Sequence, residues 1–393
     1  ASNRCRVDGA DSGEIGDWAK ASQSATRIRA TLELASKTQS PLKIDHQSLD
    51  ADPWLLNAHN GTVELKSGRL RQHSRGDLLS KRAGAAYDPD ASAPRWQQFL
   101  AEAFAGDDEL VAYVQRMVGA ALVGEQVEHV LPILWGGGAN GKSVLINTLL
   151  AAVGDYGHQA PSGLFTVRSH DQHPTELADL HGKRLVVVSE TGEGERLDEG
   201  LIKAVSGGDA IRARRMRENF WQFTPSHLAF LVTNNKTKVR GRDLGICRRL
   251  RLIPFTATVP PDRQDKELPQ KLRGVLAGVL RWMVDGCLEC QRQGLNEPES
   301  VKAATREYRE ASATIGAWLR EACEPGKPVD SCYGQPLRDN YVAWCEVVGE
   351  KPMGPRLFGM EMKKRFESGT DKRGTFYRAI RPLEAPEPAT GGG

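Results

Sequence analysis

The chain has 393 residues, of which 39% are hydrophobic and 26% are charged, and its formal net charge at pH 7 is only +3. These values are typical of a soluble globular protein with two or three domains. No apolar run approaches the roughly eighteen residues of a membrane-spanning helix, so no such helix and no membrane partner are expected. The seven cysteines are scattered and no signal peptide opens the chain, so a reducing cytoplasm is expected.

Residues 1–124 are predicted to form a mostly helical lead-in domain. A helical pattern covers residues 25–35, and short strands are expected on both sides of the Asn60-Gly61 turn. Pro94 begins a helix with an apolar face, and Asp107-Asp108 caps a second one.

A glycine-rich stretch follows the apolar run 130–135. Gly136 and Gly141-Lys142-Ser143 have the G-x-x-x-x-G-K-[ST] spacing of a phosphate-binding P-loop between a strand and a helix. Glycines let backbone N–H groups surround phosphate oxygens, and the helix N-terminus favours negative charge. Lys142 is expected to reach the β- and γ-phosphates of ATP, and Ser143 to ligate Mg²⁺. The predicted ATP contacts are Gly136, Gly137, Gly138, Ala139, Asn140, Gly141, Lys142, Ser143 and Val144.

Two later apolar runs end in polar residues. Residues 184–190 predict a buried strand that delivers Glu190 to the nucleotide, with Ser189 where many P-loop ATPases have a first acidic residue. Glu190 is predicted to act as the base for the attacking water, to help bind Mg²⁺, or to do both. A third strand over residues 228–233 ends in Asn234, whose amide suits holding the attacking water.

Arginines cluster at two places between and after these strands. Alternating residues from Ile211 to Phe223 predict a hairpin that carries Arg212, with Arg214, Arg215 and Arg217 near its tip. Arg248 and Arg249 precede the apolar run 250–255 and suit an arginine finger in a neighbouring subunit's ATP site. Seven basic residues against one acidic residue between Lys236 and Arg251 indicate a polyanionic partner.

The rest of the chain is predicted to be helical, then DNA-binding. An ATPase domain over residues 125–295 ends in helices, where Cys287 and Cys290 lie on an apolar face and are expected to be buried. A helical linker over residues 296–328 leads to residues 329–384, which have the helix, turn, basic helix and hairpin order of a winged helix-turn-helix. Its expected DNA contacts are Lys363, Lys364, Arg365, Lys372 and Arg373. A disordered tail over residues 385–393 is expected to follow.

The order of these motifs resembles the superfamily 3 helicase part of phage and plasmid primase–helicases, including the satellite-phage and poxvirus types. The resemblance extends from about residue 18 to residue 382 and rests on the segments DPWLLNAHNGTVELKSGRL, PRWQQFLAEAF, GGGANGKS, VVVSE, SGGDAIRARR, FLVTNN and RRLRLIPF. It implies an α/β fold: an AAA+-type P-loop core between a mostly helical N-terminal domain and a C-terminal winged helix.

The resemblance also implies a function. It predicts an ATP-hydrolysing homo-hexameric ring that moves on single-stranded DNA and acts on duplex or fork DNA in a bacterial host, encoded by a phage, plasmid or mobile element. It assigns Lys142, Ser143, Glu190 and Asn234 to the ATP site, Arg248 or Arg249 to the finger, and the hairpin arginines to DNA. No primase motif is present, so a primase domain upstream or a separate primase is expected.

Two other functions remain open. A P-loop ATPase that loads or remodels DNA without unwinding it would carry the same motifs. A small-molecule kinase would share the P-loop, but it leaves the basic hairpin, Arg248-Arg249 and the basic C-terminal segment without a role.

Overall fold

The computed structural model describes residues 12–37, 44–45, 48–167, 174–189, 197–234, 244–260, 262, 264–326, 330–348 and 352–383, and it divides into two compact units. The smaller unit, Ala1–Ala51 with Arg75–Ser80, contains α1 (Ser12–Ser22), α2 (Ala25–Lys37) and the short 3-10 helix η2 (Arg75–Asp77). The predicted helix over residues 25–35 is confirmed, whereas α1 was not predicted.

The larger unit begins with an antiparallel sheet of β1 (Leu55–Ala58), β2 (Gly61–Glu64) and β3 (Arg69–Arg71). Ala58 pairs with Gly61, which confirms the predicted turn. Two helices follow, α3 (Pro94–Ala103) and α4 (Asp108–Ala121). Both were predicted from their capping residues: Pro94 stands at the first helical position, and the Asp107 carboxylate accepts a hydrogen bond from Leu110 N at 2.9 Å.

The centre of the larger unit is a parallel sheet in the order β10-β4-β9-β6-β5. Its strands are β4 (Leu131–Trp135), β5 (Gly157–Ala160), β6 (Leu185–Ser189), β9 (Leu228–Thr233) and β10 (Leu250–Pro254). β4, β6 and β9 are almost continuously apolar because both faces of the sheet are covered. All five carboxyl ends lie at one edge, which is where parallel sheets bind ligands.

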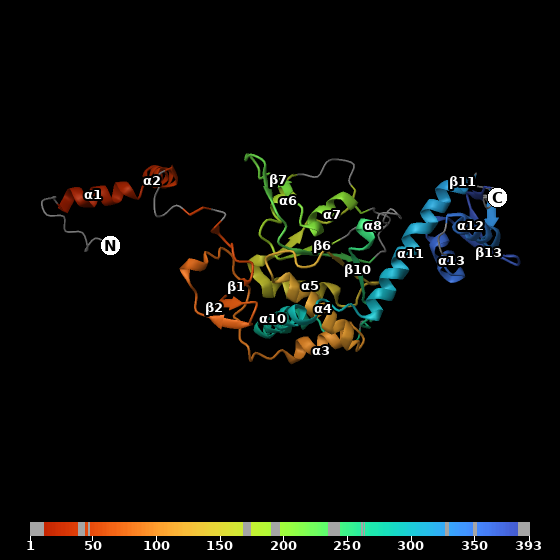
Figure 1. Cartoon of the computed structure of the whole chain (residues 1–393), viewed down its shortest axis with the longest axis horizontal. Coiled ribbons are helices and arrows are strands. Elements are labelled where there is room, and N and C mark those ends of the chain that lie inside the picture. The colour runs from red at the N-terminus through yellow and green to blue at the C-terminus, as the bar shows by residue number, and fades with distance from the viewer. Residues whose placement is uncertain are drawn as a thin grey trace, which may run out of the picture. The chain divides into compact units, whose positions relative to one another are not determined.

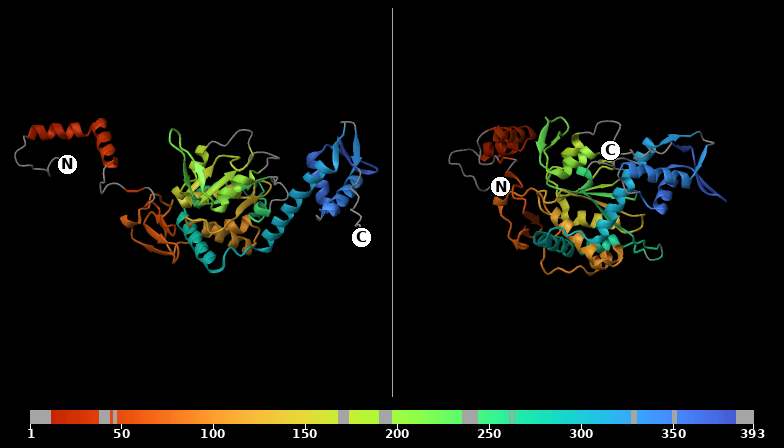
Figure 2. Two further views of the ribbon diagram at one scale, coloured as in Figure 1. Left: turned by 45° about the horizontal axis from the view of Figure 1, so that its top comes forward. Right: turned by 45° about the vertical axis from the view of Figure 1, so that its right-hand side comes forward.

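Separate hydrophobic clusters fill the two faces of this sheet. On one face, alternate side chains such as Leu134 and Val187 pack with α5 (Lys142–Val153), α3, α4 and α10 (Leu276–Gln293). On the other, Ile133 and Val188 pack with α7 (Glu199–Gly207). Figures 1 and 2 show α5 and α10 on the side of the sheet opposite α7. The short helices η3 (Gly154–Tyr156), α6 (Pro174–Ala178), α8 (Leu244–Cys247) and α9 (Leu268–Arg273) connect these elements.

α4 and α10 cross with their backbones almost in contact. A side chain at Gly119 would place its Cβ 2.1 Å from Cys287 N, and one at Gly286 would place its Cβ 2.1 Å from Gln115 O. Only glycine permits this approach. Cys287 and Cys290 on α10 are both buried, as predicted.

A buried arginine joins the lead-in strands to the central sheet. Arg184, directly before β6, donates hydrogen bonds to Leu122 O (2.6 Å) and Leu55 O (2.8 Å). Its guanidinium also stacks 4.4 Å from the ring centre of Tyr156. Residues 52–74 and 81–123 thus belong to the same unit as the sheet and share its core, while the predicted boundary at residue 124 stays a prediction.

His227 lies buried at the start of β9, and neither ring nitrogen has a hydrogen-bond partner among the described residues. Burial lowers the pKa of His227 to about 4, with a further contribution from His158. In the unfolded chain this histidine is therefore protonated below about pH 6.5, whereas in the folded chain it stays neutral down to about pH 4. The free energy of unfolding is expected to decrease as the pH falls through this window, by on the order of 3 kcal/mol.

Urea unfolding of the wild type and His227→Leu at several pH values between 7 and 4 tests this expectation. The leucine variant should show a shallower loss of stability toward low pH, because it removes the titrating group. Parallel curves for the two proteins would mean that other groups cause the pH dependence.

The C-terminal part follows the long helix α11 (Glu299–Glu321), which packs along β10 through Thr305 Oγ1, the acceptor of a hydrogen bond from Leu252 N at 2.9 Å. Beyond it lie β11 (Cys323–Pro325), β12 (Ser331–Tyr333), α12 (Gly334–Val348), α13 (Pro355–Arg365), β13 (Ser368–Asp371), β14 (Gly374–Arg378) and β15 (Ile380–Pro382). They enclose a core of Trp318, Tyr341, Phe358 and their neighbours.

The structure corrects one detail of this region. Glu324 and Pro325, predicted to lie in a linker, belong to β11, which pairs antiparallel with β15. The pairing joins residues about 57 positions apart in the chain, so no local sequence pattern predicts it. The two helices and the strand pair after residue 330 were predicted correctly. The predicted tail over residues 385–393 lies outside the described residues.

Candidate nucleotide and nucleic-acid site

The P-loop connects β4 to α5 through backbone conformations that favour glycine. Gly138 and Gly141 have φ angles of +90° and +86°, and Ala139 also lies in the left-handed region at +50°. A Cβ atom at Gly136 would approach both Asn140 Nδ2 and Phe255 O to 2.4 Å. α5 begins at Lys142, so its free N–H groups face the loop. This geometry suits a bound phosphate chain.

Lys142 is buried at the base of the loop. Its ammonium donates hydrogen bonds to Gly136 O at 2.7 Å and Asn140 Oδ1 at 3.0 Å. Burial lowers the pKa of Lys142. Ser143 follows on the exposed side of the first turn, and Gly137 and Ala139 are also exposed. The loop therefore presents its backbone and a hydroxyl outward, with a positive charge beneath.

β9 lies next to the P-loop strand β4, and β6 lies on the far side of β9. Trp135 pairs in register with Thr233, and Ser189 pairs with Val232. Asn234 is exposed directly after β9, one residue beyond the pair formed with the last residue of β4. Glu190 lies outside the described residues, so its predicted role stays a prediction. The Ser189 hydroxyl accepts a hydrogen bond from Gln159 Nε2 at 3.3 Å.

The two adjacent arginines before β10 have different surroundings. Arg249 is half-buried and donates a hydrogen bond from Nη1 to Gly245 O at 2.6 Å. Its guanidinium also lies beside Gly207 at the end of α7. Arg248 is exposed, and its side chain has no partner among the described residues. Of the two, Arg248 is therefore the more available to a molecule outside the chain.

The predicted hairpin is present as β7 (Ile211–Ala213) and β8 (Trp221–Phe223), which pair antiparallel. Figure 1 shows the hairpin projecting away from the central sheet. Alternation on either side of Glu218-Asn219 predicted the turn at these two residues. The turn instead spans residues 215–218, where Glu218 N donates to Arg215 O at 3.2 Å and Arg217 has a φ of +64°.

Two aromatic rings support the hairpin arginines, a feature that the sequence analysis missed. The guanidinium carbons of Arg212 and Arg214 lie 4.3 and 4.8 Å from the centre of the Phe220 ring, and that of Arg215 lies 5.9 Å from Trp221. All four arginines, including Arg217, are exposed, and none pairs with a carboxylate among the described residues. The sequence signal for this feature is the pair of aromatic residues, Phe220 and Trp221, close to the arginines in the chain.

The basic residues of the C-terminal part are not equivalent. Lys364 Nζ lies 3.0 Å from the carboxylate of buried Glu361, and Arg365 also forms an ion pair with it. This partner partly neutralises both charges. Lys363 on α13 is exposed, as are Lys372 and Arg373 in the turn between β13 and β14. These three are the more available cations.

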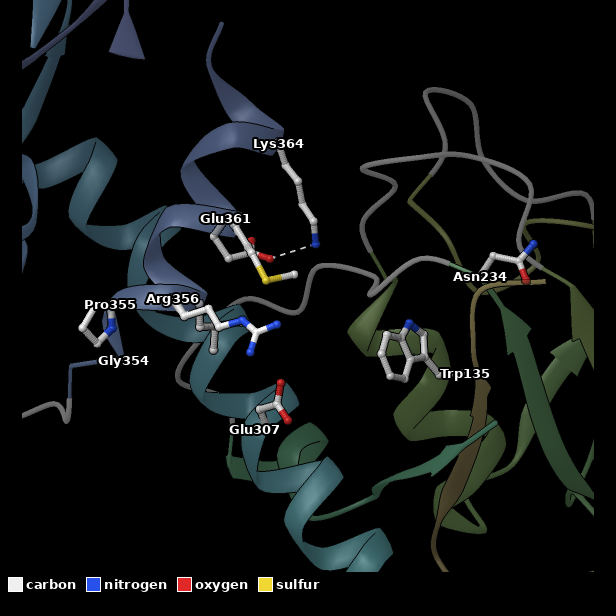
Figure 3. Close-up of a pocket in the computed structure, with 10 residues that line it drawn as sticks. Trp135, Asn234, Glu307, Gly354, Pro355, Arg356, Glu361 and Lys364 are labelled. Atoms are coloured by element: carbon white, nitrogen blue, oxygen red, sulfur yellow. Dashed lines mark hydrogen bonds and ion pairs between the residues drawn. The ribbon is translucent and has the colours of Figure 1, made fainter. Parts of the chain in front are cut away.

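A cavity of about 530 Å³ opens where β4 and β9 end. Trp135 and Asn234 line it from the central sheet, and Arg356, Met360 and Lys364 line it from α13 (Figure 3). Arg356 is exposed, and no sequence pattern singled it out. In the part of the chain that the structure describes, no cluster of three or more His, Cys, Asp or Glu side chains could hold a metal ion. The described helices also include none with the length and apolar character for crossing a membrane.

Two protein-family models match the chain. Residues 9–105 match the model described as "D5 N terminal like", and residues 134–249 match a "Family of unknown function (DUF5906)". The second match contains the P-loop, the hairpin and Arg248-Arg249, and the first contains the lead-in strands and α3.

Several viral proteins are similar in sequence. The "Putative helicase L207/L206" of Acanthamoeba polyphaga mimivirus is 27% identical over 286 residues, 67% of this chain and 30% of that protein. The "Putative helicase 184R" of Invertebrate iridescent virus 6 is 24% identical over 58% of this chain and 25% of its own length. The "Putative primase C962R" of African swine fever virus is 25% identical over 52% of this chain and 22% of its own length. The chain thus spans less than a third of each relative.

Among solved structures, the apo NrS-1 C-terminal region aligns with a TM-score of 0.47 at 13% identity, over 76% of this chain and 72% of that one. The named relatives belong to viruses of eukaryotes, so the predicted bacterial host receives no support from them.

Proposed function

The chain belongs to the D5-type family of primase–helicases, and from that premise we propose that it is an ATP-dependent DNA helicase. In this proposal it hydrolyses ATP as a homo-hexameric AAA+ ring and moves along single-stranded DNA at a fork. A primase domain or partner protein would supply primers. The names of its relatives support the helicase class, and the residues of this chain support the roles that follow.

The arrangement of the central sheet supports ATP hydrolysis. In chain order the five strands run 5-1-4-3-2 across the sheet, so the strand before the P-loop lies next to the strand that ends at Asn234. An amide beside the P-loop can hold the attacking water against the γ-phosphate, as ATPases of this kind require. Glu190, next in the chain after Ser189, is proposed as the base.

Magnesium fits the donor set of the loop. The Ser143 hydroxyl is exposed in the first turn of α5, where a hydrated cation carried by the β- and γ-phosphates could reach it. When bound, Mg²⁺ would neutralise charge on the phosphates during transfer. Glu190 is the candidate carboxylate partner for its water shell.

The exposed guanidinium of Arg248 favours this residue as the finger that serves a neighbouring subunit. A finger acts on another subunit's nucleotide, so its side chain must leave its own chain. Arg249 is instead held by Gly245 O and lies against α7. The proposal therefore assigns the finger to Arg248 and a structural role to Arg249.

The observation that carries the DNA proposal is the β7–β8 hairpin. It concentrates four exposed arginines on a short projection, where no described carboxylate pairs with them, and the aromatic rings of Phe220 and Trp221 contact three of them. Ordered guanidinium groups of this kind suit the phosphates of a nucleic acid strand. Phe220 is 45% exposed and offers a face for a base.

The paired substitution Arg215→Ala/Arg217→Ala tests this assignment. Basal ATP hydrolysis should stay close to that of the wild type, because neither side chain contacts the P-loop. DNA-stimulated hydrolysis and displacement of a strand from a tailed duplex should be lost together, and single-strand binding should weaken with a shallower salt dependence.

The pair Lys302→Ala/Arg306→Ala is a matched control, since it removes two exposed positive charges from α11. The control should unwind normally. Collapse of basal hydrolysis in the hairpin variant would place these arginines in the nucleotide site, and unimpaired unwinding would show that DNA contacts lie elsewhere. If the wild type shows DNA-stimulated ATP hydrolysis but displaces no strand, a loading ATPase would be favoured over a helicase.

The C-terminal part is proposed to be a winged helix that binds duplex DNA. Two features support this arrangement. The three strands have the order β12-β14-β13 in their sheet, and α12 and α13 follow β12 and precede β13 in the chain. Lys363, Lys372 and Arg373 would make the phosphate contacts, with smaller contributions from Lys364 and Arg365 because Glu361 pairs with both.

A further inference from the structure

Asn140 differs from the other residues of the phosphate-binding loop, because its side chain points inward. It is 4% exposed, while its neighbours Gly137 and Ala139 are open to solvent. Its amide oxygen accepts a hydrogen bond from Lys142 Nζ at 3.0 Å, and its amide nitrogen donates to Phe255 O at 3.4 Å. The spacing rule for P-loops allows any residue at this position.

The contacts of Lys142 show what the amide oxygen does. An ammonium group has three donors, and a buried donor without an acceptor is costly. Gly136 O and Asn140 Oδ1 satisfy two of the three donors. No described residue accepts a hydrogen bond from the third donor, so this donor is left for a phosphate oxygen of the nucleotide while Gly136 O and Asn140 Oδ1 keep the ammonium in place.

The other half of the amide connects the loop to the segment that follows β10. Phe255 N donates to Trp135 O at 2.7 Å, and Val259 N donates to Ala139 O at 3.0 Å. These bonds, with the one from Asn140, hold the two ends of the loop against residues 255–259. The loop is therefore ordered before any phosphate arrives.

We propose that Asn140 is a positioning residue that holds the Lys142 ammonium and the loop ready for phosphate. This inference rests on the proposed nucleotide site and assigns a task to a side chain within it. Binding then costs little reorganisation, because the lysine is already extended beneath the loop. Asn140 acts mainly on nucleotide affinity, through Lys142, and not on the chemical step.

Binding of ADP in magnesium-free buffer, measured by calorimetry, tests the assignment in a double-mutant cycle. Asn140→Ala should weaken ADP binding about tenfold, the effect expected for one hydrogen bond to a charged group. In the Lys142→Ala background, the same substitution should change the affinity less than about twofold, because its partner is gone. In steady-state hydrolysis, Asn140→Ala should raise KM for ATP and leave kcat nearly unchanged.

Asn140→Asp provides a second variant of the same shape. Its carboxylate would compete with phosphate for the ammonium, so ADP affinity should fall further than in Asn140→Ala. Thermal unfolding of each variant shows that the fold is retained.

Three outcomes would overturn the inference: ADP affinity within twofold of the wild type in Asn140→Ala, wild-type affinity in Asn140→Asp, or an equal loss with and without Lys142. The last would mean that Asn140 acts only on the shape of the loop. Failure of the wild type to bind ADP or ATP would instead contradict the proposed function itself.

Discussion

Replacing Lys142 by alanine is expected to abolish ATP hydrolysis while the protein stays folded. The lysine is the one buried cation among the described loop residues, and it lies beneath the exposed backbone that would hold phosphate. Without it, the charge that develops on the transferred phosphoryl group loses its fixed positive partner. Phosphate release measured with and without single-stranded DNA should fall to background.

Lys302→Ala is the matched control for this experiment, because Lys302 is an exposed lysine on α11, away from the loop. It should hydrolyse ATP as the wild type does. The fold of the Lys142→Ala protein can be compared by circular dichroism and thermal unfolding. Retained turnover in a folded Lys142→Ala protein would count decisively against the nucleotide site.

Replacing Arg248 by alanine is expected to reduce the rate of hydrolysis by on the order of 10³ while nucleotide binding is kept. The exposed guanidinium has no partner among the residues that the structure describes, so its loss should leave thermal stability nearly unchanged. Arg249→Ala provides the contrast. It removes a hydrogen bond to Gly245 O from a half-buried side chain and should lower the unfolding temperature.

Mixing Arg248→Ala protein with Lys142→Ala protein separates action between subunits from action within one. In mixed rings, some sites combine an intact P-loop with an intact arginine from the neighbour, so part of the activity should return. Equal amounts of each variant and gel filtration of the mixture would establish that mixed assemblies form. No recovery in proven mixed assemblies would show that both residues serve the same chain's site.

Much of the fold and site could be predicted from local patterns. The G-x-x-x-x-G-K-S spacing, the apolar runs of β4, β6, β9 and β10, and the capping residues of α3 and α4 depend on neighbours in the chain, and all of these elements are present. The hairpin was predicted from alternation between Ile211 and Phe223, although its turn spans residues 215–218 and not Glu218-Asn219.

Long-range contacts decided what these patterns left open. Arg248 and Arg249 are adjacent in the sequence, and only the packing of α7 and α8 shows that Arg249 is held within the chain, whereas Arg248 is exposed. In the same way, Glu361 partly neutralises Lys364 and Arg365, whereas Lys363 remains exposed. A charge's availability depends on what folds against it.

The sequence by itself determined the form of the predicted phosphate-binding loop, because the glycines and the lysine lie within eight consecutive residues. Only the tertiary structure decided the strand order that brings Asn234 beside the loop, the pairing of β11 with β15, and the inward contact of Asn140 with Phe255. Each of these joins segments more than fifty residues apart, and the free energy of such contacts comes from packing and hydrogen bonds between surfaces that no local pattern specifies.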